Sequence, residues 1–240
     1  MGVNQETPFA FNQPVIDVSA GPRYTLVIDP DGDAYVSGFI ESMFEYLGQF
    51  GVERGELSQG SNRWKQIDTI VDTNGRERNS PPFAQVYAGA TGSANSGEMH
   101  SLLIDQDGDV YTTGNNNRGQ LCLGDREPRD IPHRVNLDGV GSPAVSAAIG
   151  EDFTLILLAD GKVLGCGSNE KGEIGLGSVR SVDVRTSIDG LTGIVDMSAG
   201  LNFALFQTSR GKVYATGSNI YMQQCKDTDG EPTTTPKVSI

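Results

Sequence analysis

Residues 114–124 read GNNNRGQLCLG, and residues 167–177 read GSNEKGEIGLG. Both stretches carry glycines at their first, sixth and last positions and an asparagine at the third. They lie 53 residues apart, which is within the spacing range of repeat proteins built from small stacked units. The pair therefore indicates an internal repeat, and the rest of the chain can be aligned on it.

Glycines mark the same repeat four times. In each copy a first glycine is followed by a second after 11 residues and by a third after 6 more. The three sets are Gly21, Gly97, Gly150 and Gly200, then Gly32, Gly108, Gly161 and Gly211, then Gly38, Gly114, Gly167 and Gly217. Four copies with identical spacing explain why this chain has 31 glycines in 240 residues.

The residues between these glycines predict paired strands. An aromatic or imidazole ring stands three positions after the first glycine, and a leucine stands two positions later. Residues two apart share one face of a strand, so ring and leucine should enter one core. Sequences such as Asp107-Gly108 and Asp160-Gly161 then predict tight hairpin turns with a positive φ at the glycine.

Each unit has room for four strands in about 50 residues, the composition of a propeller blade. We predict one all-β repeat domain over residues 1–240, with repeats at 13–68, 83–137, 144–188 and 193–240. The first two glycine turns are 76 residues apart, because residues 39–46, 72–82 and 90–97 are inserted. We expect these insertions to be loops, which often carry specificity on a repeat scaffold.

The glycine, ring, leucine, Asp-Gly and GNNNRGQLCLG pattern resembles the regulator of chromosome condensation repeat, of the type aG-x-x-H-t-l, dG and wG-x-N-x-x-GQLGlG. The resemblance covers essentially the whole chain. The second unit matches best, with His100 at the histidine position, whereas the fourth unit retains only Gln223 of its signature. The tryptophan of the pattern is replaced in all four units, by Ser37, Thr113, Cys166 and Thr216.

The resemblance implies a β-propeller, usually of seven blades. Four blades in that geometry would form a partial, open ring with two unpaired edges, which makes self-association a candidate interaction. We expect a partial gene product in preference to closure by another chain or an unusual small ring.

Composition restricts the partners and the compartment. The chain has 31 acidic and 18 basic side chains, a formal charge of -13, which disfavours nucleic acid as the main ligand. Cys122, Cys166 and Cys225 form no CxxC pair, so we predict buried free thiols. The N-terminus lacks a signal-peptide pattern and no apolar run would span a bilayer. We expect a soluble intracellular protein, in the cytoplasm or nucleus, that binds no membrane.

Several motifs resemble active sites without meeting the requirements. The acidic turns at residues 29–33 and 105–109 lack the spacing and closing glutamate of a calcium loop. The glycine-rich runs lack the Gly-Lys-Ser/Thr ending of a P-loop. His100 occupies a ring position, so we expect a packed ring with hydrogen-bonded nitrogens. We predict no catalytic residue, no cofactor and no metal site.

We predict a noncatalytic protein-interaction scaffold that binds a protein partner through loops on one propeller face. Trp64 is either a strand anchor or an exposed contact, and the aromatic insertion 39–46 either caps a core or forms a contact surface. The candidate contact residues are Phe39, Met43, Phe44, Tyr46, Asn117, Arg118, Glu170, Lys171 and Tyr221. The alternative, which the resemblance alone implies, is guanine-nucleotide exchange on a small GTPase.

Overall fold

The computed structural model describes residues 11, 13–38, 51–52, 64–89, 99–224 and 231–238. In these ranges all regular secondary structure is β-strand, which confirms the predicted all-β class. None of the described residues form a helix of the length and hydrophobicity that crossing a membrane requires.

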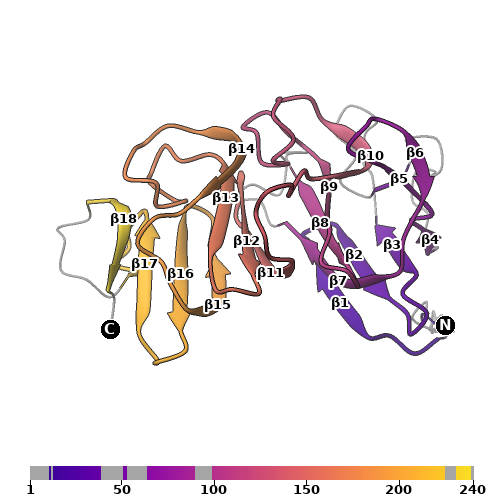
Figure 1. Ribbon diagram of the computed structural model, residues 1–240, viewed down its shortest axis with the longest axis horizontal. Helices are drawn as coiled ribbons and strands as arrows, with labels where there is room; N and C mark the ends of the chain where they lie inside the picture. Colours follow the sequence, from indigo (N-terminus) through magenta and orange to yellow (C-terminus); the bar gives the residue numbers. More distant parts are fainter. Residues whose placement is uncertain are drawn as a thin grey trace, which may run out of the picture.

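Four sheets, each built on four antiparallel strands, follow one another along the chain, and we call them blades 1 to 4 (Figure 1). Blade 1 contains β1 (Asp17–Ala20), β2 (Tyr24–Ile28), β3 (Ala34–Gly38) and β4 (Lys65–Gln66). Blade 2 is built on β7 (Phe83–Ala88), β8 (His100–Asp105), β9 (Val110–Gly114) and β10 (Arg129–Arg134). Blade 3 contains β11 (Ala144–Ile149), β12 (Phe153–Leu158), β13 (Val163–Gly167) and β14 (Val182–Ser187). Blade 4 contains β15 (Ile194–Ala199), β16 (Phe203–Thr208), β17 (Val213–Gly217) and β18 (Thr233–Val238).

Blade 2 has two additional strands from the connection that follows blade 1. β5 (Thr69–Val71) pairs in parallel with β10, and β6 (Glu77–Asn79) pairs with β5 on its outer side. Residues 72–82, which we expected to be a loop, are therefore strand at residues 77–79. A β-turn closed by the Asp72 side chain, which accepts hydrogen bonds from Asn74 N and Arg76 N, makes this short hairpin possible.

The hairpin turns between the second and third strands adopt one geometry. Gly32, Gly108, Gly161 and Gly211 have φ values of 88°, 82°, 79° and 79°. The positive φ predicted at the glycine is confirmed, and among the described residues only Cys122 and Met222 have a positive φ besides glycines. The turn is a type I turn followed by a left-handed glycine, since Gly32 N donates to Asp29 O at 3.0 Å.

These turns also join each blade to the next. The carbonyl groups of Gly32, Gly108 and Gly161 accept hydrogen bonds from backbone N–H groups at the start of the following blade, namely those of Phe83, Ala144 and Ile194. A β-carbon on Gly108 would lie 2.5 Å from Pro143 Cβ, so the approach requires glycine. Nothing lies within 4 Å of that position at Gly211 in blade 4.

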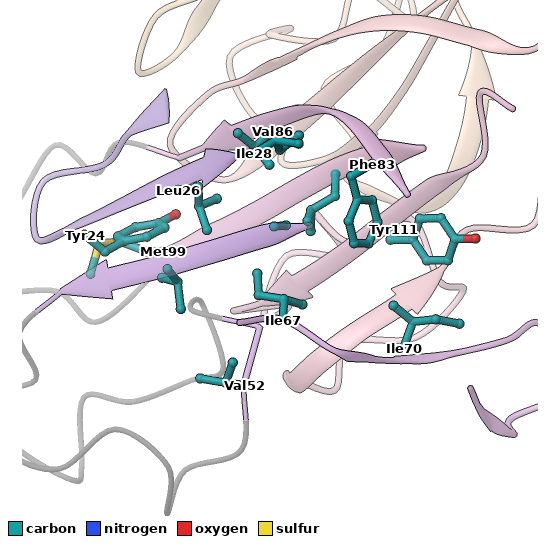
Figure 2. Packing of buried hydrophobic residues seen from close by; sticks show 13 residues of the cluster. Tyr24, Leu26, Ile28, Val52, Ile67, Ile70, Phe83, Val86, Met99 and Tyr111 are labelled. Carbon is teal, nitrogen blue, oxygen red and sulfur yellow. The ribbon is translucent and has the colours of Figure 1, made fainter. Parts of the chain in front are cut away.

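The hydrophobic core is divided into three clusters, one between each pair of neighbouring blades. Figure 2 shows the cluster of blades 1 and 2, where Tyr24, Leu26 and Ile28 of β2 pack near Phe83 and Tyr111 of blade 2. Side chains alternate between faces, so Leu102 belongs to one cluster and Leu103 to another. Because blades 2 and 3 are covered on both faces, β8 and β12 are buried at every residue.

The ring-and-leucine face of blades 1 to 3 points toward the following blade. In blade 4 this face is partly uncovered: Phe203 and Leu205 are half-buried, and Gln207 is exposed where blades 1 to 3 have Ile28, Ile104 and Leu157. Blades 1 and 4 lie at opposite ends of the molecule, so the four blades form an open arc (Figure 1).

Candidate functional site

The connection between the third and fourth strands of a blade makes a sharp corner with the same bonds in blades 2, 3 and 4. A buried asparagine stands at the third position of each corner, at Asn116, Asn169 and Asn219. Its Oδ1 accepts a hydrogen bond of 3.0 Å from the backbone N–H five residues later. The asparagine thus takes the place of a strand partner inside the turn.

A second polar side chain fixes the tip of each corner. Gln120 Oε1 accepts from Arg118 N at 2.9 Å, Glu173 Oε2 from Lys171 N at 2.8 Å, and Gln223 Oε1 from Tyr221 N at 2.9 Å. Burial raises the pKa of Glu173, while its hydrogen bonds from Lys171 N and Ser168 oppose that shift. The tips therefore sit on a rigid polar frame, whose side chains are largely hidden from solvent.

The tip residues themselves are exposed and differ between blades. Asn117 and Arg118 form the tip in blade 2, Glu170 and Lys171 in blade 3, and Tyr221, with an exposed fraction of 88%, in blade 4. Arg118 Nη1 lies 2.7 Å from Glu170 Oε1, so neighbouring tips touch. Both side chains are about half exposed, and such a pair contributes at most about 1 kcal/mol.

The tips share one end of the blades with the turns between the first and second strands. Gln120 Nε2 of a blade 2 corner donates to Asp152 Oδ1 of a blade 3 turn at 3.2 Å. Ser168 N donates to Asp152 O at 2.7 Å, which ties the blade 3 corner to the same turn. We call this end the corner face and define it by the exposed tips Asn117, Arg118, Glu170, Lys171 and Tyr221.

The structure thus brings together five of the nine predicted contact residues. The other four, Phe39, Met43, Phe44 and Tyr46, lie outside the described residues, as does Gly97. The insertions 39–46 and 90–97 follow the ends of β3 and β7, which point to the same end of the blades as the end of β9.

The sequence analysis missed two apolar tip residues of blade 4. Ile220 and Met222 are 65% and 66% exposed, on either side of Tyr221. Met222 has a φ of 57° at the position of Gly119 and Gly172. Aligning the fourth unit on the others would have found this substitution, because the repeat pattern has glycine there.

The ring position of the repeat connects neighbouring blades through hydrogen bonds. His100 is completely buried, and its Nε2 lies 2.8 Å from Thr154 Oγ1 of blade 3. The same hydroxyl donates to Gln120 O at 2.8 Å, so it must accept from His100 Nε2–H. His100 Nδ1 has no hydrogen-bond partner among the described residues, contrary to the expectation that both nitrogens are bonded.

The prediction of free thiols is wrong for two of the three cysteines. Cys122 of the blade 2 corner and Cys166 of β13 form a disulfide, with Cα atoms 5.4 Å apart. Their 44-residue separation concealed this pairing, because adjacent blades bring one corner against the next blade's third strand. Cys122 replaces the glycine of the repeat, and Cys166 replaces the tryptophan. Cys225 lies outside the described residues.

The acidic turns use their carboxylates within the turn. Asp29 Oδ1 accepts hydrogen bonds from Asp31 N and Asp33 N, both at 3.0 Å. Asp105 Oδ1 accepts from Asp107 N and Asp109 N at 3.0 and 2.9 Å. This bonding explains the repeated Asp-x-Asp-Gly sequence as turn chemistry.

Four antiparallel sheets, joined side by side with a core at each junction, define this chain as a β-propeller repeat protein. It contains regulator of chromosome condensation (RCC1) repeats, since residues 107–157 and 144–173 match the models of that repeat.

Relatives and a solved structure agree with this assignment. The chain is 32% identical to the RCC2 homolog of Xenopus laevis over 149 residues, 61% of this chain and 28% of that protein. It is 35% identical to the secretion-regulating guanine nucleotide exchange factor of Mus musculus over 135 residues, 55% of this chain and 29% of that protein. Prp20p of Saccharomyces cerevisiae, studied for binding to Gsp1p and histones, superposes with a TM-score of 0.77 at 17% identity. That match covers 97% of this chain and 52% of Prp20p.

The chain spans less than a third of the length of these two relatives and about half of Prp20p. The comparison therefore establishes the fold of this chain. It does not assign the activities of those proteins to it.

Proposed function

We propose that this chain is a noncatalytic protein-interaction scaffold, whose four blades form one repeat domain and present a protein-binding surface at the corner face. The observation that carries the proposal is that three corners share one buried hydrogen-bond frame while their exposed tips differ. A rigid frame with variable tips is how a repeat scaffold combines constant folding with a specific contact surface.

The tip chemistry suits contact with another protein. Tyr221 offers a large amphipathic side chain, and tyrosine is enriched at the energetic centres of interfaces. Ile220 and Met222 extend this apolar tip, while Arg118, Glu170 and Lys171 provide charges of both signs on the tips of blades 2 and 3. Protein interfaces combine apolar and aromatic contacts with polar and charged ones, and the corner face offers both kinds. We also propose that the protein acts inside the cell, in the cytoplasm or the nucleus, and the fold that it shares with Prp20p, a protein studied for binding to histones, supports this.

The test is affinity purification with tip variants under quantitative mass spectrometry. Lys171→Ala combined with Tyr221→Ala should weaken the affinity for at least one partner about thirtyfold, because an interface tyrosine at an energetic centre contributes roughly 2 kcal/mol. Lys162→Ala is the matched control, since Lys162 is an exposed lysine on the hairpin turns at the opposite end of the blades. Equal recovery of every partner by the double variant and the control would contradict the assignment of the corner face.

Guanine-nucleotide exchange on a small GTPase is the second candidate. It is favoured by the 35% identity to an exchange factor and by a fold shared with a Gsp1p-binding protein. Such a surface would act by distorting the GTPase phosphate and magnesium contacts, so the scaffold itself would need no nucleotide site. Release of a fluorescent nucleotide from a panel of small GTPases tests this: acceleration by the wild type and not by the tip variant would support exchange through the corner face.

A further inference from the structure

A pocket of about 500 Å³ lies on the rim between blades 2 and 3, away from the corner-face tips. We call it the rim pocket. Its walls come from the outer strands β10 and β14, from the turn between β5 and β6, and from Cys122 and Leu123 after the blade 2 corner. None of the five residues that define the corner face line it.

The rim pocket is rich in cationic side chains, although the chain as a whole carries a formal charge of -13. Arg129, Arg134 and Arg185 line it together with His133, whereas Asp72 is the one acidic residue in its lining. Asp72 is already engaged, because its Oδ2 accepts from Arg78 Nε at 3.1 Å and its Oδ1 accepts two backbone N–H groups. Arg78 does not line the pocket. The lining therefore contains three arginines and one carboxylate, which is an excess of positive charge.

Two of the three arginines keep donors that their protein partners do not use. Arg185 contacts the backbone carbonyls of Asn136 and Asp138, and among the described residues it has no carboxylate partner. Arg134 pairs with Asp109 through Nη2. Its Nε is buried and has no hydrogen-bond partner among the described residues.

Arg129 differs from the other two. Its Nη2 lies 2.5 Å from Asp125 Oδ2, and its Nη1 donates to Glu127 O at 2.7 Å. Arg129 is therefore held in place by these partners, and Asp125 neutralises most of its charge. His133 Nδ1 lies 3.0 Å from Ile131 O, which assigns the proton of the neutral ring to Nδ1. Burial lowers the pKa of His133, so the ring is neutral at pH 7.

We propose that the rim pocket binds a phosphate group, with Arg134 and Arg185 as its main ligands. Guanidinium groups match phosphate oxygens in geometry and charge, and they prefer such oxyanions to the single oxygen of a carbonyl. A phosphate would supply Arg185 with the anion that it lacks, and Arg134, which lines the same pocket, would add a second guanidinium group. The pocket volume exceeds the need of a free phosphate, and it leaves room for the residues on either side of a phosphorylated side chain.

The proposal is tested by calorimetric titration of the full chain with three probes: inorganic phosphate, a short phosphoserine peptide, and the same peptide with unmodified serine. Saturable binding of phosphate or phosphopeptide, but not of the unmodified peptide, is expected. Arg185→Gln and Arg134→Gln should each weaken that binding about tenfold or more, as expected when one charged hydrogen bond is lost.

Lys162→Gln is the control, because it removes one positive charge outside the pocket and should leave the affinity within about twofold. Two pocket variants are used because Arg134→Gln also leaves Asp109 without its partner. Tighter binding of the phosphopeptide than of free phosphate would identify a phosphorylated chain as the ligand, and equal binding would identify free phosphate. No saturable binding by the folded wild type, or equal loss in all three variants, would overturn the proposal.

Discussion

His100 is a titratable ring at a position where blades 3 and 4 have phenylalanine. Its Nε2–H is committed to Thr154, so an added proton would have to reside on Nδ1, which is buried without an acceptor. Burial accordingly lowers the pKa of His100 to about 3. Folding therefore favours the neutral ring, and the histidine makes the blade 2–3 junction sensitive to acid.

The pH dependence of stability should reveal this histidine. The folded pKa is about 3 and that of an unfolded histidine is about 6.5, so between these values the unfolded chain binds more protons. Stability should fall as the pH drops below about 6.5, by up to roughly 1.4 kcal/mol per unit. Urea unfolding at pH 7, 6 and 5 should show a shallower slope for His100→Phe than for the wild type. His133→Asn is the comparison variant: burial also lowers the pKa of His133, but to a smaller extent, so this variant should flatten the slope less than His100→Phe. Identical slopes for wild type and His100→Phe would contradict this account.

The corner glycines show how one element depends on the next. Gly172 has a φ of 76°, and a β-carbon there would lie 2.7 Å from Thr234 Cα of β18. Gly119 has the same relation to Asp183, at 2.5 Å. These glycines are required twice over, by backbone conformation and by close packing of the neighbouring outer strand. Met222 stands at the equivalent position of blade 4, so a further blade could not approach that corner as β14 and β18 approach the others.

A pair of substitutions separates these two requirements. Gly190 also has a positive φ, 83°, but nothing lies within 4 Å of its β-carbon position. Gly190→Ala should cost about 1 kcal/mol of unfolding free energy from backbone strain. Gly172→Ala should cost roughly 3 kcal/mol or more, because overpacking against a fixed backbone adds to that strain. Denaturant midpoints measure the difference, and equal losses would show that β18 yields to the added methyl group.

The contacts at the junctions between neighbouring blades hold the four blades together. Blades 2 and 3 share a hydrophobic cluster, the His100–Thr154–Gln120 hydrogen bonds and the Cys122–Cys166 disulfide. The two cysteines occupy a glycine and a tryptophan position of the repeat pattern. The middle junction of the arc is thus the one that is covalently closed.

Reduction should weaken that junction. A disulfide across 44 residues stabilises a domain by about 2–4 kcal/mol, chiefly by restricting the unfolded chain. Thermal unfolding with a strong reductant should therefore begin at lower temperature than without it. The double variant Cys122→Gly, Cys166→Ser should unfold at the temperature of the reduced wild type. Its unfolding temperature should be the same with and without reductant. A wild type that contains three free thiols by mass spectrometry before reduction would refute the cross-link.

Glycine spacing and residue alternation were sufficient to predict the strands, the turns and the propeller class. These patterns are local consequences of backbone geometry, which each unit of about 50 residues repeats. The five described tip residues could be proposed as contacts for the same reason, since a repeat shows where its variable positions fall. The strand at residues 77–79 escaped prediction, because its pairing partner β5 joins a sheet built from later residues.

Contacts between blades required the folded chain. The Cys122–Cys166 pair, the partner of His100 and the assembly of Arg134 with Arg185 all join residues from different strands that sequence spacing does not relate. Within a blade, each strand forms hydrogen bonds with the strand next to it in the sequence. The periodicity of the sequence therefore predicts which residues pair. Between blades, side chains meet according to the packing angle of whole sheets, and this angle depends on every residue in the junction.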